Sequence, residues 1–173
     1  PVKLSGDRMD VRVRETNLGN AVADALLDYG QSDFTHKSNL AVTNGGGLRE
    51  TIAKDKPITK GDIIAVLPFG NSVAQIQVTG QNIYDMFVKS LGSILQVNES
   101  GKNVFDENGQ PLLEPSGGFL QVAGARVYYD TTLPTEKRIL SIDILDPETG
   151  VYKPLNTTET YYLVTNDFLA CWW

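Results

Sequence analysis

The order of helical and strand patterns is the feature that most constrains the fold of this chain. Helical patterns occupy residues 14–30 and 79–92, whereas strand patterns at 119–130, 138–145 and 160–170 follow one another without helices between them. The regular alternation of strands and helices that a doubly wound parallel sheet requires is therefore missing. We expect a single α+β domain, built on a mixed β-sheet with flanking helices.

Local signals mark the ends of both expected helices. Thr16 or Asn17 can cap the first and Gly30 can end it, while Thr79 can cap the second and Gly92 can end it. The spacing of apolar residues predicts which side chains face the core. They are Leu18, Ala21, Val22, Ala25 and Leu26 in the first helix, and Ile83, Phe87 and Leu91 in the second.

The remaining segments are read from turn residues and alternation. Residues 39–44 form a short apolar run, and residues 72–80 alternate apolar with polar side chains, so each predicts a strand. Residues 59–71 pass through an apolar run to a Pro-Phe-Gly-Asn stop, which indicates a loop carrying an aromatic ring. Residues 93–118 are rich in Gly, Asn, Glu and Pro, and we expect an insertion or hairpin outside the core.

Composition excludes several classes of function. The 173 residues include 15 basic and 21 acidic ones, a formal charge of −6, which argues against a nucleic-acid surface. A local arginine cluster can still hold a small anion. No apolar run approaches the roughly 18–20 residues of a membrane span. With one cysteine and one histidine, we expect no disulfide, no Cys/His zinc site and no cofactor within the chain.

The run Gly45-Gly46-Gly47, followed by Arg49, has two readings. The glycines can form a simple turn, or their amides can converge on an anion with the arginine nearby. No lysine follows as in a P-loop, and the spacing does not match a dinucleotide fingerprint. His36 lies in a polar stretch and reads as a surface histidine. No catalytic residue is expected in this chain.

Other candidate ligand groups are basic and aromatic. In an extended segment Arg8, Arg12 and Arg14 would share one face, either as a solvated edge or as an anion site. Phe69 and Phe168 lie beside loop-forming residues, so their rings either pack in the core or sandwich a flat heterocycle.

Six segments in this order resemble the C-terminal domain of the 5'-nucleotidase family, which includes UDP-sugar hydrolases. They are RETNLGNAVADALL, TNGGGLR, VLPFGN, VTGQNIYDMF, GGFLQVAG and TNDFLA, and the likeness runs from about Leu4 to Ala170. It implies a division of labour, in which an N-terminal metallophosphatase domain carries two divalent metal ions and the catalytic residues. The C-terminal domain binds the nucleotide and presents its phosphate to those metals.

The resemblance also implies roles for individual residues. Asn44 and Arg49 would hold the phosphate or ribose side of the substrate, and Arg12, joined by Arg8, would neutralise the phosphate.

On the base side, Phe69 and Phe168 would clamp the base between their rings and Asn71 would hydrogen-bond its edge. Gly117 would lie beside the base, where a side chain would obstruct it. Because every base has a π-face, selectivity for the base would be loose.

The chain departs from the family at its end. There the family has a Gly-Gly-Asp-Gly turn whose aspartate contacts the ribose, whereas this chain ends Cys171-Trp172-Trp173. No ribose-binding aspartate can be assigned, and residues 1–173 read as the C-terminal domain truncated at its end. The start at Pro1 without methionine indicates a processed chain or an excerpt.

The expected function is that of the substrate-binding domain of a secreted, metal-dependent 5'-nucleotidase acting on a nucleoside monophosphate, with an extracellular, periplasmic or cell-wall location. The alternatives are a relative acting on 2',3'-cyclic nucleotides or UDP-sugars, and a non-catalytic nucleotide-binding or structural module.

Overall fold

The structure is a computed structural model and describes residues 2–171. The terminal residues Pro1, Trp172 and Trp173 lie outside the described part, and with them most of the ending that replaces the family's glycine–aspartate turn. The helices are α1 (Arg8–Val11), α2 (Asn17–Ser32), α3 (Lys60–Val66), α4 (Gly80–Ser90) and α5 (Asp167–Ala170), with 3-10 turns η1 (Gly45–Gly47) and η2 (Thr135–Lys137). The strands are β1 (Leu40–Asn44), β2 (Val73–Thr79), β3 (Leu120–Ala123), β4 (Ala125–Tyr129), β5 (Ile139–Leu145), β6 (Tyr152–Pro154) and β7 (Thr160–Asn166).

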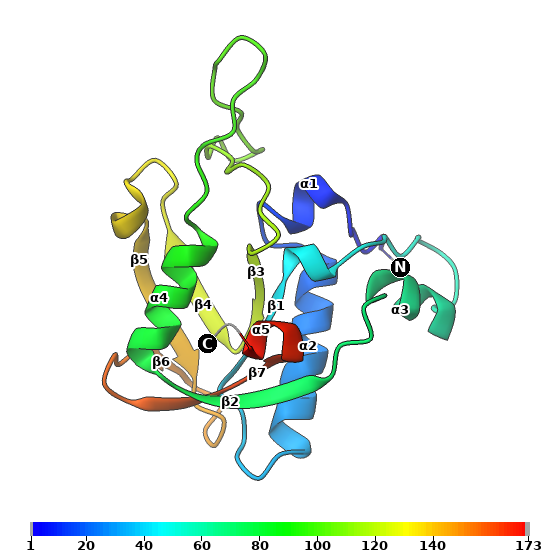
Figure 1. The fold of residues 1–173 in the computed structure, drawn as a ribbon, viewed down its shortest axis with the longest axis vertical. Coiled ribbons are helices and arrows are strands. Elements are labelled where there is room, and N and C mark those ends of the chain that lie inside the picture. Colours follow the sequence, from blue (N-terminus) through cyan, green and yellow to red (C-terminus); the bar gives the residue numbers. More distant parts are fainter. Residues whose placement is uncertain (1, 172–173) are drawn as a thin grey trace.

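The strands form two sheets. The larger has the order β2-β7-β1-β3, with β1 parallel to β7 and the other neighbours antiparallel. The smaller is the antiparallel sheet β4-β5-β6. Figure 1 shows α2 along one side of the larger sheet and α4 beside β4 and β5 on the other side of the molecule. The expected α+β class with a mixed sheet and flanking helices is therefore confirmed.

Helix α2 begins where predicted, because the Thr16 side chain accepts a hydrogen bond from the N–H of Gly19 at 3.0 Å. It runs on to Ser32, two residues beyond the predicted end at Gly30. The predicted apolar stripe is partly wrong. Ala21 and Ala25 are exposed, and the buried positions are Leu18, Gly19, Ala23, Leu27 and Gly30. The buried face therefore combines two leucines with small residues, which let the helix lie close to the sheet.

Helix α4 matches its prediction closely. Thr79 forms a capping box with Asn82, and Ile83, Phe87 and Leu91 are all buried. Ile83 and Phe87 enter the main core together with residues from both sheets, whereas Leu91 packs with Leu113 and Phe119. The segment before β2 contains a further helix with a capping box, α3, where only an apolar run leading into a loop was expected.

The predicted strand at 119–130 is interrupted at Gly124. This glycine has φ +70°, and a Cβ there would lie 2.3 Å from the carbonyl oxygen of Asn39. Only glycine fits a left-handed conformation at such close approach. The chain therefore leaves the larger sheet as β3 and enters the smaller one as β4.

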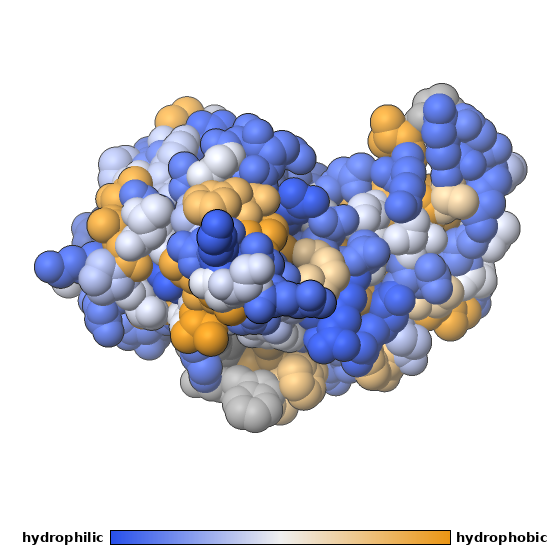
Figure 2. Space-filling model, turned by 90° about the horizontal axis from the view of Figure 1, so that it is seen from above, coloured by the Kyte–Doolittle hydropathy of each residue, from blue (hydrophilic) through white to orange (hydrophobic). Residues whose placement is uncertain are grey.

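The insertion or hairpin expected at residues 93–118 is a projecting hairpin, seen at the top of Figure 1. Isolated bridges pair Leu95 with Leu113 and Phe105 with Pro111. Its base is not outside the core as expected, since Leu113 is buried against Leu91 and Phe119. Figure 2, looking down on this end, shows a largely hydrophilic surface with apolar residues in separate groups. No helix within residues 2–171 is long and apolar enough to cross a membrane.

Candidate functional site

The predicted ligand residues gather along one edge of the four-stranded sheet, the edge formed by the ends of its strands. β1 and β7 run parallel and end at this edge, and the antiparallel strands β2 and β3 begin there. Residues placed next to these strand ends are Asn44, Phe69, Asn71, Gly117 and Phe168. Because the four strand ends meet, segments far apart in the sequence become neighbours. Loops at the ends of strands are where folds commonly hold their ligand-binding groups.

The glycine turn η1 lets the arginine-bearing segment pack on the end of β1. A Cβ on Gly45 would lie 2.0 Å from the carbonyl oxygen of Val11 and 3.2 Å from the Cα of Arg12. A Cβ on Gly46 would lie 3.0 Å from the carbonyl oxygen of Gly117, which accepts the Gly46 N–H at 3.0 Å. The turn is thus a packing element that brings Arg12 and Gly117 to the same edge.

Arg12 carries a buried donor that has no partner. Its Nε is buried and makes no hydrogen bond within the described residues. Burial, and then the charges of Arg8 and Arg49, lower the pKa of Arg12, so the three cationic groups act on one another. A buried donor left unpaired costs about 1–3 kcal/mol. An anion at this place would accept from Nε and offset the repulsion between the arginines.

Arg14 does not join this group. The expected extended segment is instead the short helix α1 with its following turn, and Asp10 draws Arg14 away through a 2.6 Å contact between Nη2 and Oδ1. The hydrogen bonds that Arg14 donates to Asp10 raise the pKa of Arg14. The condition for a shared face of Arg8, Arg12 and Arg14, an extended segment, is therefore not met, because the residues form a helix and a turn.

Arg49 connects the glycine turn to the Phe69 loop. Its N–H donates to the carbonyl oxygen of Val66, the last residue of α3, at 3.0 Å. Its guanidinium carbon lies 4.9 Å from the centroid of the Phe69 ring, a cation–π contact. The Phe69 side chain is 55% exposed. With Arg49 over one face of the ring, the other face offers a stacking surface for a flat ligand.

Phe168 reaches the same edge from helix α5, which replaces the last part of the strand expected at 160–170. The N–H of Asp167 donates to the carbonyl oxygen of Ser72 at 2.9 Å, so α5 lies beside the segment that carries Asn71. Phe168 is 51% exposed and Asn71 is also exposed. Both side chains are therefore accessible at the edge.

Asn166 is a site residue that the sequence reasoning missed. Its Oδ1 accepts the N–H of Leu169 at 2.8 Å and so caps α5, while its Nδ2 donates to Oδ1 of Asn44 at 3.4 Å. Asn44 in turn donates from Nδ2 to the carbonyl oxygen of Gly117 at 3.2 Å. This amide chain couples the Phe168 helix to the glycine turn. An asparagine directly before Asp-Phe-Leu-Ala is a helix-cap signal that could have revealed it.

The described residues offer little for metal binding. Within residues 2–171 no three His, Cys, Asp or Glu side chains come together as a group that could hold a metal ion. The donors at this edge are guanidinium groups and amides, which suit an anionic, hydrogen-bonding ligand rather than a cation.

Comparison with known proteins adds independent evidence. The family model described as the 5'-nucleotidase C-terminal domain matches residues 2–171. A trifunctional nucleotide phosphoesterase of Bacillus subtilis is 34% identical over 98% of this chain and 10% of its own length. The venom 5'-nucleotidase of the snake Gloydius brevicauda is 32% identical over 98% of this chain and 27% of its own length.

A solved structure with a sequence identity similar to that of these two relatives shows the same fold. The 5'-nucleotidase precursor of Thermus thermophilus superposes with a TM-score of 0.76 and 34% identity, over 98% of this chain and 29% of that protein. The chain thus spans less than a third of the length of each of these relatives. With nearly every residue covered by the family model and by these relatives, the chain belongs to the 5'-nucleotidase C-terminal domain family.

Proposed function

We propose that this chain is the nucleotide-binding domain of a secreted, metal-dependent 5'-nucleotidase that hydrolyses a nucleoside monophosphate. The observation that carries the proposal is the buried, unpartnered Nε of Arg12 under the influence of Arg8 and Arg49. A phosphate is the anion that such a cluster of planar donors recognises well. The named nucleotidase relatives support this choice of anion.

The ligand would lie along the sheet edge with its phosphate at the arginines and its base at the aromatic rings. Arg12, Arg49 and Arg8 would neutralise the phosphate. Asn44, fixed by its bond to the carbonyl of Gly117, would present its amide to the phosphate or ribose side.

At the other end, the exposed rings of Phe69 and Phe168 would stack on the base and Asn71 would bond to its edge. Each aromatic contact of this kind is worth about 0.5–1.5 kcal/mol beyond the area it buries. The backbone of Gly117 would leave room for the base.

The bond-breaking chemistry would take place outside the described residues. These residues provide no fitting set of metal ligands, so we derive no catalytic step from them. Two divalent ions on an N-terminal metallophosphatase domain would supply the activated water. The groups of this chain would bind the nucleotide and orient its phosphate. A secreted location is in keeping with the venom relative.

A broader substrate range is the second candidate. The Bacillus relative is named as trifunctional, and stacking on phenylalanine discriminates weakly among bases. A site of this kind would also accept cyclic nucleotides or UDP-sugars in place of a monophosphate. A module that binds nucleotides without turnover is the remaining alternative.

The test is titration of the chain with AMP, adenosine and inorganic phosphate, followed by chemical-shift changes. We expect AMP to bind more tightly than either fragment. Phe69→Ala should weaken AMP and adenosine but not phosphate, whereas Arg49→Ala should weaken AMP and phosphate. The chain alone should show no phosphatase activity with added divalent metals. AMP affinity unchanged from the original chain in either variant, or metal-dependent turnover by the pure chain, would contradict the proposal.

A further inference from the structure

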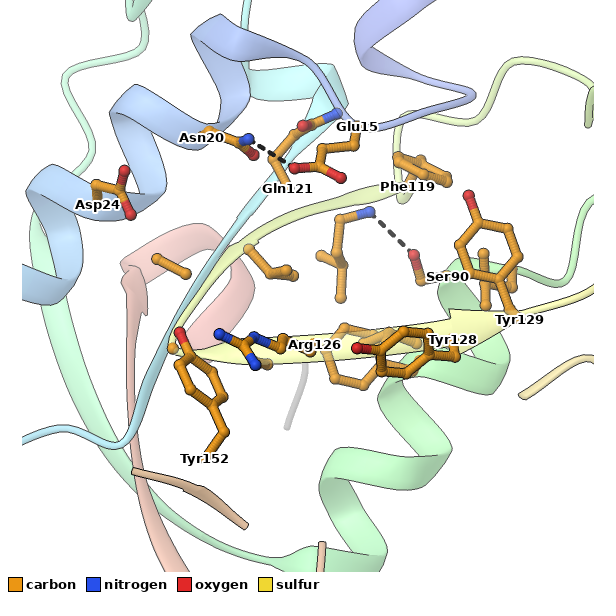
Figure 3. Close-up of a pocket in the computed structure, with 18 residues that line it drawn as sticks. Glu15, Asn20, Asp24, Ser90, Phe119, Gln121, Arg126, Tyr128, Tyr129 and Tyr152 are labelled. Atoms are coloured by element: carbon orange, nitrogen blue, oxygen red, sulfur yellow. Dashed lines mark hydrogen bonds between the residues drawn. The ribbon is translucent and has the colours of Figure 1, made fainter. Parts of the chain in front are cut away.

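A cavity of about 410 Å³ lies along β3 and β4, and none of the eight predicted ligand residues lines it. Figure 3 shows its two walls. On one wall Glu15 directly precedes the N-cap of α2, and Asn20 and Asp24 lie in the first turns of that helix; the facing wall is the strand β4 with its side chains. The volume is within the range of sites that hold small ligands or short peptide segments.

The floor of this cavity is the free edge of the larger sheet. β3 is the outermost strand of the order β2-β7-β1-β3. The N–H of Gly45 donates to the carbonyl oxygen of Phe119, which fixes the odd-numbered residues of β3 as those bonded to β1. The backbone groups of Leu120 and Val122 therefore point away from β1. Consistent with this, the N–H of Leu120 donates to Oγ of Ser90 at 2.9 Å, on the cavity side.

Val122 is thus an edge position that faces the cavity. Its N–H and C=O point out of the sheet, and no strand within residues 2–171 pairs with that side of β3. A row of unpaired backbone groups on a sheet edge is a template for an added strand. Extended peptides commonly bind in this way, with backbone bonds giving affinity and side-chain pockets giving selectivity.

The β4 wall has the side chains that dominate protein–protein contacts. The Arg126 guanidinium lies 4.0 Å from the centroid of the Tyr152 ring, and no described carboxylate forms a salt bridge with it. Tyr128 is 51% exposed and Tyr129 is 37% exposed. Tyrosine and arginine are over-represented among residues that carry binding energy at interfaces.

The opposite wall is acidic. Glu15 accepts a hydrogen bond from Nδ2 of Asn20 at 2.6 Å, and Asp24 lies one turn further along α2. Burial, and then the charges of Glu15 and Asp106, raise the pKa of Tyr129. Asp106 therefore adds negative charge near the Tyr129 end of the cavity. A peptide with basic side chains directed at α2 would complement these charges.

We propose that this cavity binds an extended peptide segment of a partner polypeptide, which adds to the β3 edge at Val122 and directs basic side chains toward Glu15 and Asp24. The binding site is separate from the proposed nucleotide site, so it stands or falls independently of nucleotide binding.

The probe is the capped peptide acetyl-Val-Lys-Val-Lys-Val-amide, titrated into the 173-residue chain with backbone amide shifts recorded. We expect shifts at residues 120–128 and slower amide exchange at Val122, both unchanged by saturating AMP. The matched peptide with glutamate in place of lysine should bind at least tenfold more weakly. Equal binding of the two peptides, or shifts confined to other surfaces, would overturn the proposal.

Variants of Val122 and N-methylated peptides test whether the peptide adds as a strand to the edge of β3. Val122→Pro removes the outward N–H while leaving the bonds to β1 intact, since proline is tolerated on the free side of an edge strand. It should reduce binding of the lysine peptide at least tenfold, whereas Val122→Thr should not.

If Val122→Pro fails to fold, lysine peptides N-methylated at alternate amides replace it. One methylation pattern should abolish binding and the other should spare it. Equal effects of both patterns would refute strand addition.

Discussion

The surroundings of Arg12 and of Arg138 differ in one instructive respect. Arg138 is only 6% exposed, yet its guanidinium finds hydrogen-bond acceptors. Nη1 donates to the carbonyl oxygens of Leu91 and Ser93, and Nε donates to the carbonyl oxygen of Leu133. Arg12 has a buried Nε without a partner and two like charges acting on it. Both arginines lie among backbone segments from several elements.

The contrast separates a structural cation from a binding cation. At Arg138 the carbonyls at the end of α4 satisfy the guanidinium, so the fold itself uses the charge. At Arg12 the fold holds a guanidinium whose buried Nε has no hydrogen-bond acceptor within residues 2–171. Proteins leave few buried polar groups unpaired, so such a group calls for an external partner.

The largest expected effect is on stability at Arg138. Arg138→Met leaves one buried and two partly buried carbonyl oxygens without their donor, and we expect a loss of about 3 kcal/mol in the free energy of unfolding. Urea denaturation monitored by circular dichroism measures it. A loss below about 1 kcal/mol would remove the distinction between the two arginines.

Arg12→Met should reverse the pattern. Removing this guanidinium relieves repulsion from Arg8 and Arg49, so the free energy of unfolding should change by less than about 1 kcal/mol. Affinity for AMP should fall at least tenfold, about 1.4 kcal/mol, in an isothermal titration. Destabilisation as large as that of Arg138→Met, with AMP affinity kept, would mean that Arg12 is structural.

A smaller change is expected at Asn166. Asn166→Asp keeps an oxygen that can cap α5 but removes the Nδ2 donor to Asn44. The thermal midpoint should hold, because aspartate is a good N-cap, whereas AMP affinity should fall a few-fold as Asn44 loses its fixed orientation. Asn166→Ala is the matched control, since it removes both bonds and should lower the midpoint as well. Unchanged AMP affinity in Asn166→Asp would show that the amide chain has no part in binding.

The smallest effect is expected at Asp146, which forms an ion pair with the exposed Lys153. A hydrogen bond from Lys153, at 2.6 Å, is the main cause that lowers the pKa of Asp146 to about 2. A carboxylate with a lowered pKa stabilises the fold above its unfolded pKa of about 4, and this contribution is lost as pH falls through about 2. Asp146→Asn should therefore lower the thermal midpoint slightly at pH 7 and by less at pH 2, where Asp146 of the folded chain is already partly protonated. An equal difference at both pH values would contradict this linkage.

Much of the fold was predictable because its signals are local. The caps at Thr16 and Thr79 and the α4 stripe of Ile83 and Phe87 depend on neighbouring residues, and they are as predicted. The division of residues 119–130 between two sheets was not predictable, because a strand pattern continues on both sides of Gly124. The exposure of Ala21 was missed for a similar reason, since a tertiary contact decides it.

The sequence motifs proposed candidate site residues, and they did not specify how these residues lie relative to one another. Asn44, Arg49 and Phe69 came from motifs, and the structure places them at one edge. The even spacing of Arg8 and Arg14 misled, because a four-residue helix intervenes. That Arg12 lacks a partner depends on every group around it, which no local pattern specifies.

The most direct test of the central claim is the side-chain spectrum of the arginines. In ¹⁵N-labelled protein, the Nε–H signals of Arg12 and Arg138 report on each guanidinium separately. On titration with AMP, the account predicts a large, saturable shift at Arg12 and none at Arg138. Saturable AMP binding that leaves the Arg12 signal unmoved would contradict it.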